Sequence, residues 1–289
     1  MENVLVASRK FLLDHEKIVF RVAIGLALFL VSLGTYWFLP LGIDWANTYR
    51  PAAREVLSLR SPYNIAIYHS PPWSVIPILP LALLPERIGY GINFSLAIAA
   101  TAFVAYRLGA KPMMILVLLF SYPILFMASY GQVDWLIYLG FLLPPKWGLF
   151  LVLIKPQISI GLVIYWFIQA LREGGIKKAA VTFLPVSIAL LLSFLVFGNW
   201  FQSSFTETGK IFNASLWPQS IPIGIVILIT AVRQRSVNLA IIASPFLSPN
   251  LAPHGWGVAL LALSPYTLEL FAASLGFWIL RLMTDIFLR

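Results

Sequence analysis

The sequence predicts an all-α polytopic membrane protein with about ten or eleven transmembrane helices, some of them short or broken. Of the 289 residues, 60% are hydrophobic and only 11% are charged, and the mean hydropathy is +0.87. A soluble domain carries about 25% charged residues. From Lys17 onwards the chain consists of apolar stretches separated by short polar or Pro/Gly-rich joints. We therefore expect residues 1–289 to form a single transmembrane domain, with no room for a separate soluble one.

The basic residues indicate orientation rather than a nucleic-acid partner. The net charge is +9, but the Lys and Arg residues are scattered along the chain. Lys and Arg are retained on the cytoplasmic side of a membrane, and Arg9, Lys10, Lys17 and Arg21 stand at the amino end of the first apolar stretch. That stretch, 18–39, is too long for a cleavable signal and lacks a small-residue cleavage pattern. We expect it to be the first span, with the amino terminus in the cytoplasm.

The longest polar stretch follows this span and forms the predicted first outer loop, 40–87. Within it, residues 45–59 place Tyr49, Ala53 and Val56 on one face of a helix and Arg50 and Arg54 on the other. Such a segment is amphipathic and too polar to span the bilayer. We expect a helix that lies on the outer membrane face and ends before a Ser-Pro pair, because the residue before proline disfavours the helical region.

The apolar segment 71–85 is expected to stay on the outer side. It has 15 residues, about 22 Å as a helix, and is interrupted by prolines. If it does not span, twelve of the 20 Lys and Arg residues face the cytoplasm, six lie outside and two lie near the carboxyl end. If it spans, Arg107, Lys111 and Lys146 move outside and only Arg87 moves in. The first arrangement agrees better with the positive-inside bias.

The remaining elements follow in order. Spans are expected at 88–106 and 112–128. The next two apolar segments, 135–143 and 147–154, are shorter than a full span and resemble half-membrane helices that meet at Pro144-Pro145-Lys146. Broken helices at membrane depth are tolerated only where protein or a water-filled cavity covers their backbone.

The second half of the chain begins with 158–171, which returns to a basic cytoplasmic joint at 172–178. Residues 179–197 lead out to a second outer loop, 199–217. Three further apolar stretches are separated by joints at 233–235, 248–255 and 264–265. We find no internal repeat, which argues against the inverted-repeat transporters.

Ionisable groups at membrane depth are costly and usually functional. Five gather on the predicted outer side: Asp44, Arg50, Asp134, Lys155 and His254. Each has an ordinary explanation. Either aspartate is suited to capping a helix, the arginine to contacting lipid headgroups and the lysine to snorkelling to the interface. The histidine lies between a proline and a glycine, as is typical of a loop residue.

A family resemblance connects these residues. The run Asp44-Trp45…Tyr49-Arg50-Pro51-Ala52-Ala53…Ser61-Pro62-Tyr63 resembles the first outer loop of the polyprenol-phosphate-mannose-dependent alpha-mannosyltransferases, which belong to the glycosyltransferase C superfamily. Four later motifs occur in the expected order between about 44 and 254: Pro71-Pro72, Gly131-Gln132, Lys155-Pro156-Gln157, and Ser244-Pro245 with Pro253-His254.

The resemblance implies transfer of a sugar, expected to be mannose, from a polyprenyl-phosphate donor to an acceptor hydroxyl on the extracytoplasmic side. Asp44 would be the catalytic base. Lys155 and Arg50 would stabilise the leaving phosphate. The residues expected to bind sugar or acceptor are Tyr49, Tyr63, Gln132, Asp134, Gln157 and His254.

The implied partners are the polyprenyl-phosphate-linked sugar, membrane lipids, and a glycolipid, glycan or protein acceptor, with no nucleic acid. The expected location is the plasma membrane, with the active site outside the cytoplasm. With no cysteine and three histidines, we expect no dedicated metal site and no cofactor, although Asp44 can share a divalent cation with the donor phosphate.

Two other classes of protein remain as alternatives. A permease or lipid flippase would place ionisable groups opposite one another inside several spans, and the sequence has almost none there. A non-catalytic membrane scaffold related to the enzymes would keep the spans and tolerate the loss of Asp44.

Overall fold

The computed structural model describes residues 26–27, 30–200 and 213–287, and every regular element in these ranges is a helix. The predicted all-α class is therefore confirmed. Two predicted elements lie partly outside the described residues: residues 18–25 and 28–29 of the first span, 18–39, and residues 201–212 of the second outer loop, 199–217.

Within the described ranges, three helices are long and apolar enough to cross a membrane: α4 (Glu86–Arg107), α9 (Ile160–Phe197) and α14 (Thr267–Phe287). A fourth crossing is counted if the pair α5 (Pro112–Leu119) and α6 (Tyr122–Tyr130), bent by 60°, forms one span. The described chain is thus suited to a membrane. The larger number of spans predicted from the apolar stretches is not confirmed, because prolines and glycines divide several stretches into shorter helices.

The first loop contains the predicted amphipathic helix. It begins as a π-helical turn, η1 (Trp45–Tyr49), and continues as α2 (Arg50–Leu57). Ala52 and Ala53 are buried while Arg54 is exposed, as the helical spacing predicts. The 3₁₀ turn η2 (Pro62–Asn64) follows.

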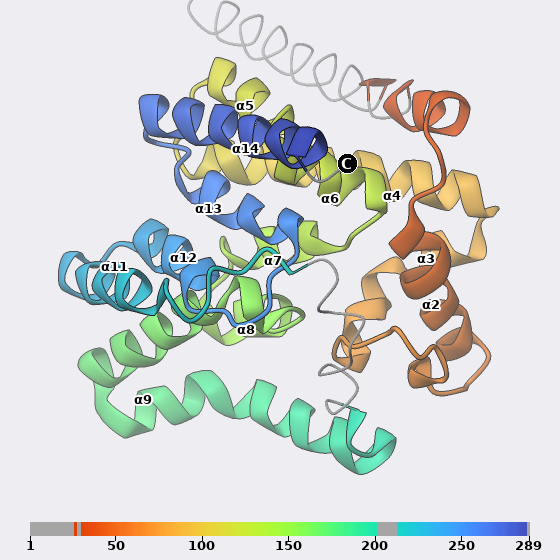
Figure 1. The fold of residues 1–289 in the computed structure, drawn as a ribbon. Helices are drawn as coiled ribbons and strands as arrows, with labels where there is room; N and C mark the ends of the chain where they lie inside the picture. Colours follow the sequence, from red (N-terminus) through yellow and green to blue (C-terminus); the bar gives the residue numbers. More distant parts are fainter. Residues whose placement is uncertain (1–25, 28–29, 201–212, 288–289) are drawn as a thin grey trace, which may run out of the picture.

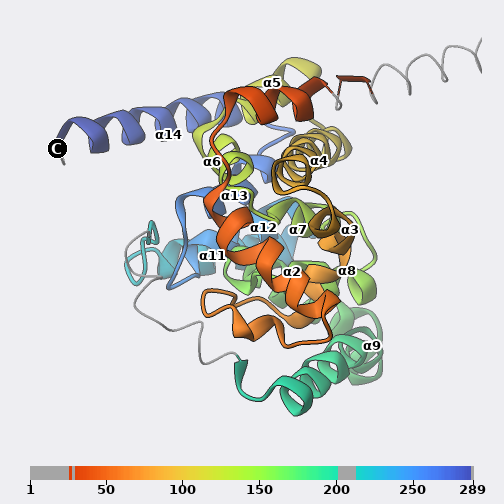
Figure 2. The same cartoon turned by 90° about the vertical axis from the view of Figure 1, so that its right-hand side faces the viewer.

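The apolar segment that was predicted not to span forms only η3 (Pro72–Ile78) and α3 (Leu79–Leu83). Together these are too short for the ~30 Å hydrocarbon core. They lie beside α2 on one side of the molecule (Figures 1 and 2).

The two predicted half-length helices are α7 (Asp134–Gly140) and α8 (Pro145–Val152), with Pro144 at the break. They pack closely because each has a glycine at the contact. A Cβ added to Gly148 would lie 2.7 Å from the carbonyl oxygen of Gly140. The 3₁₀ turn η4 (Pro156–Ile158) follows α8.

Helix α9 consists of two arms, because Gly174 and Gly175 have non-helical backbone angles. The break lies in the predicted basic joint, and Figure 1 shows the arms diverging from it. The remaining elements are α11 (Ile221–Gln234), α12 (Val237–Phe246), η6 (Pro253–Trp256) and α13 (Gly257–Ala262).

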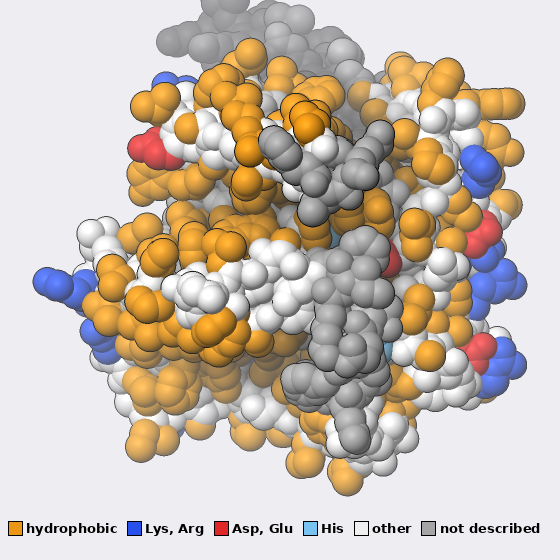
Figure 3. Space-filling view, viewed as in Figure 1, with side chains coloured by type: hydrophobic (Ala, Val, Ile, Leu, Met, Phe, Trp, Pro, Cys, Tyr) orange, Lys and Arg blue, Asp and Glu red, His pale blue; other side chains and the backbone are white. Residues whose placement is uncertain are grey.

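In Figures 1 and 2, α4, α5, α6 and α14 form one layer and α9 lies at the opposite end. Helices α7, α8, α12 and α13 lie between them. Apolar side chains cover much of the surface in Figure 3, and those of Leu195 and Leu268 are 73% and 75% exposed. Such a surface suits a lipid environment.

Candidate functional site

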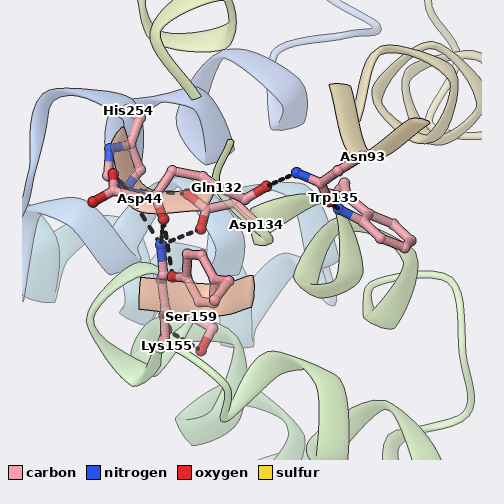
Figure 4. A network of polar contacts seen from close by, with 9 residues as sticks. Asp44, Asn93, Gln132, Asp134, Trp135, Lys155, Ser159 and His254 are labelled. Carbon is pink, nitrogen blue, oxygen red and sulfur yellow. Dashed lines mark hydrogen bonds and ion pairs between the residues drawn. The ribbon is translucent and has the colours of Figure 1, made fainter. Parts of the chain in front are cut away.

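Six of the nine residues predicted for the site form one polar network that joins four separate segments (Figure 4). They are Asp44 and Tyr49 from the first loop, Gln132 from the link between α6 and α7 (residues 131–133) with Asp134 at the start of α7, Lys155 before η4, and His254 in η6. All are buried except Asp44, which is half-buried. The network lies at the ends of short helices rather than within one of the long apolar helices.

Lys155 and Asp134 form a buried ion pair, with Nζ 2.5 Å from Oδ1. The His254 Nε2 atom lies 3.4 Å from both Asp134 Oδ2 and Lys155 Nζ. The lysine therefore neither snorkels nor stands as an unpaired cation. In this structure Asp134 pairs with the Lys155 cation, and the expectation that Lys155 binds the donor phosphate stays a prediction.

Gln132 connects this ion pair to Asp44. Its Nε2 donates to Asp44 Oδ2, and its Oε1 accepts from the Tyr49 hydroxyl at 3.0 Å and from Lys155 Nζ. An amide oxygen that faces two donors and an amide nitrogen that faces a carboxylate have a single satisfactory orientation. The side chain of Gln132 is thus fixed at both ends.

Two glycines, Gly42 and Gly131, let the backbone of the first loop approach the link between α6 and α7 closely. Helix α6 ends at Gly131, whose φ of +75° is the left-handed conformation that favours glycine. A Cβ there would lie 2.5 Å from Trp45 Cβ, and one on Gly42 would lie 2.8 Å from the Tyr130 backbone. The two glycines allow a backbone approach close enough for Asp44 to reach Gln132.

Asp44 precedes η1 but its side chain makes no capping hydrogen bond. The carboxylate turns to Gln132 instead, and its Oδ1 has no hydrogen-bond partner among the described residues. Burial raises the pKa of the Asp44 carboxyl, and Lys155 and the Gln132 hydrogen bond counter part of that rise. The ordinary explanation as a helix cap therefore lacks geometric support, and a carboxylate with one free oxygen can accept a proton.

His254 is buried and its ring stacks on Phe126, with centroids 5.9 Å apart. Its Nδ1 has no hydrogen-bond partner in the described part of the chain. Burial lowers the pKa of His254 to about 4, although Asp134 opposes this effect. The imidazole is thus neutral at pH 7, so one lysine faces two carboxylates and a neutral ring.

Three predicted site residues lie elsewhere. Arg50 donates to the Leu84 carbonyl at 3.3 Å and lies 3.6 Å from Glu86, so it contacts the junction of α3 and α4. Tyr63 stacks on Trp200 with ring centroids 5.5 Å apart. Gln157 is exposed in η4. Among the described residues, none of these three side chains forms a hydrogen bond or ion pair with the network.

Two buried residues of the site were missed by the sequence analysis. Asn93, in the long helix α4, donates from Nδ2 to the backbone carbonyl of Gln132 at 3.3 Å. Trp135 Nε1 donates to Asn93 Oδ1 at 3.1 Å. The signal was an asparagine inside an apolar span, because a polar side chain at that depth needs partners.

The described residues contain no group of three or more His, Cys, Asp or Glu side chains that could hold a metal ion. No family model, no curated protein and no solved structure matches the chain. The interpretation of the site therefore rests on its geometry and on the sequence motifs.

Proposed function

We propose that the protein is a membrane glycosyltransferase that moves a sugar, mannose by its motifs, from a polyprenyl-phosphate donor to an acceptor hydroxyl. The observation that supports this proposal is the half-buried Asp44 carboxylate, held at one oxygen by Gln132 and free at the other. A general base requires a carboxylate in a fixed position within reach of the hydroxyl that it deprotonates.

In the proposed reaction the acceptor hydroxyl gives its proton to Asp44 while its oxygen bonds to the anomeric carbon of the sugar. The bond from that carbon to the phosphate oxygen breaks, and the phosphate leaves with the electron pair. Its charge needs a cation. Lys155 supplies one by exchanging its contact with the Gln132 oxygen for the phosphate, while Asp134 keeps it in place. Gln132 and His254 orient sugar hydroxyls.

The natural test is transfer by the purified protein in liposomes. Radiolabelled mannose on a short-chain polyprenyl phosphate should pass to an added mannoside or glycolipid acceptor, measured by extraction and chromatography. The folded wild-type protein should give a labelled product that depends on both substrates. Failure of the folded protein to release any sugar from the donor, with or without acceptors, would contradict the proposal and favour the scaffold.

The proposed location is the plasma membrane, with the amino terminus inside and residues 40–87 and 199–217 outside, as the basic residues suggest. The chain has no cysteine, so single cysteines at the exposed positions Ser58 and Lys177 are specific probes. A membrane-impermeant maleimide should label Ser58→Cys in intact cells and Lys177→Cys only after lysis. The reverse pattern would invert the orientation.

A solute permease is the second candidate, favoured by the buried Asp134, Lys155 and His254 group. Transport requires such charges to line a path through spanning helices. Asp134 instead begins α7, Lys155 precedes η4 and His254 lies in η6, and each of these helices is shorter than a span. The glycosyltransferase is therefore the better-supported function.

A further inference from the structure

We propose that Asn93, in the span-length helix α4, is a positioning residue of the Asp44 site and acts through the backbone of Gln132. The structure forms a chain of hydrogen bonds from Trp135 to Asn93, from Asn93 to the Gln132 carbonyl, and from the Gln132 amide to Asp44. The predicted effect of Asn93 on sugar transfer rests on the proposed function. The predicted effect on the titration of Asp44 does not.

The Asn93 side chain is completely buried. An amide buried without partners is costly, so its hydrogen bonds hold the side chain in one position. The oxygen accepts from the Trp135 indole and the nitrogen donates to Gln132. Because the indole is only a donor, it fixes which end of the Asn93 amide faces Gln132.

Two side chains of α4 donate hydrogen bonds to the end of α6 and to the link that carries Gln132. Tyr90, also in α4, donates its hydroxyl to the Ser129 carbonyl at 2.7 Å, and Asn93 holds the Gln132 carbonyl. The first loop is held by the same helix, since Trp45 Nε1 donates to the Glu86 carbonyl at 3.1 Å. Helix α4 thus fixes both the link and the loop, and Asn93 is its contact closest to the amide that binds Asp44.

A displacement of Gln132 therefore changes the environment of Asp44 directly. The hydrogen bond from Gln132 is the only one that Asp44 receives among the described residues. The charged and titratable groups around the carboxyl are Lys155, Asp134, Tyr49 and His254. A hydrogen bond to a carboxylate favours its ionised form, so a weaker bond from Gln132 should leave Asp44 protonated to higher pH.

The experiment measures the titration of Asp44 without substrate. Dicyclohexylcarbodiimide adds to a protonated carboxyl group, and rearrangement of the adduct leaves a stable acylurea that mass spectrometry assigns to a peptide. The rate of labelling at Asp44 is followed against pH, with Asp44→Asn identifying the peptide. In Asn93→Ala, labelling at pH 7 should be at least about threefold faster, corresponding to an upward shift of roughly half a pH unit.

Thr101→Val is the matched control. Thr101 is equally buried on α4, eight residues further on, and its hydroxyl donates only within the helix, to the Ala97 carbonyl. This variant should leave the labelling profile of Asp44 unchanged. An unchanged profile in folded Asn93→Ala, or an equal shift in Thr101→Val, would overturn the inference.

Trp135→Phe tests the same chain if Asn93→Ala does not fold. It removes the indole donor but keeps the amide of Asn93, so it should shift the profile in the same direction by a smaller amount. An unchanged profile in that variant would also overturn the inference. In the transfer assay, Asn93→Ala should lower kcat by about tenfold with little change in the KM for the donor, because orientation of the base affects the chemical step.

Discussion

Asp44→Asn is expected to lower sugar transfer by about 100-fold or more while leaving the melting temperature of the protein unchanged. The amide cannot accept the proton of the acceptor hydroxyl. Its oxygen still accepts the hydrogen bond from Gln132 Nε2, the one that Asp44 receives. The measurement pairs initial rates in the liposome assay with a thermal melt of the same preparation in detergent.

Glu55→Gln is the matched control for this experiment. Glu55 is a carboxylate of the same loop whose hydrogen bonds with Arg60 and Asn64 hold its pKa at about 2. It lies outside the network, so its variant should keep full transfer activity. Near-normal transfer by well-folded Asp44→Asn would remove Asp44 from catalysis and leave the scaffold as the better hypothesis.

Lys155→Met is expected to destabilise the protein by about 3–5 kcal/mol, because it leaves the Asp134 carboxylate buried without its cation. Asp134 is completely buried and its ion pair with Lys155 is the shortest contact that it makes. The double variant Lys155→Met with Asp134→Asn should recover much of the loss, since it removes the uncompensated charge. Unfolding in detergent by heat or denaturant, monitored by tryptophan fluorescence, measures both.

Lys178→Met provides the comparison with an exposed ion pair. Lys178 contacts Glu173, and both side chains are at least half exposed. A surface pair contributes about 0–1 kcal/mol, so this variant should melt close to the wild type. If Lys155→Met were as stable as Lys178→Met, the buried ion pair between Lys155 and Asp134 would not stabilise the protein, and the prediction would be wrong.

Much of the site was visible in the sequence because polar groups are conspicuous in so apolar a chain. Asp44, Asp134, Lys155 and His254 were singled out as ionisable groups, Gln132 and Tyr49 were predicted by the family resemblance, and all six meet in the network. The cost of burying such groups makes their presence informative. Arg50 was singled out in the same way and Tyr63 was predicted by its motif, but both lie outside the network, where Arg50 contacts Glu86 and Tyr63 stacks on Trp200.

The sequence by itself determined the all-helical class, the amphipathic helix of the first loop, and the breaks at Pro144 and at Gly174-Gly175. These features depend on composition, helical periodicity and the backbone limits of proline and glycine, which act within a few residues.

Only the tertiary structure decided that Lys155 is paired with Asp134 and that Asn93 supports Gln132. Each of these depends on contacts between segments that lie 20 or more residues apart, as in the 39-residue separation of Asn93 from Gln132. Contacts of this kind do not produce a periodic pattern of residues in the sequence. They follow from close backbone approaches, such as that of Gly131 to Trp45, which bring separate segments together.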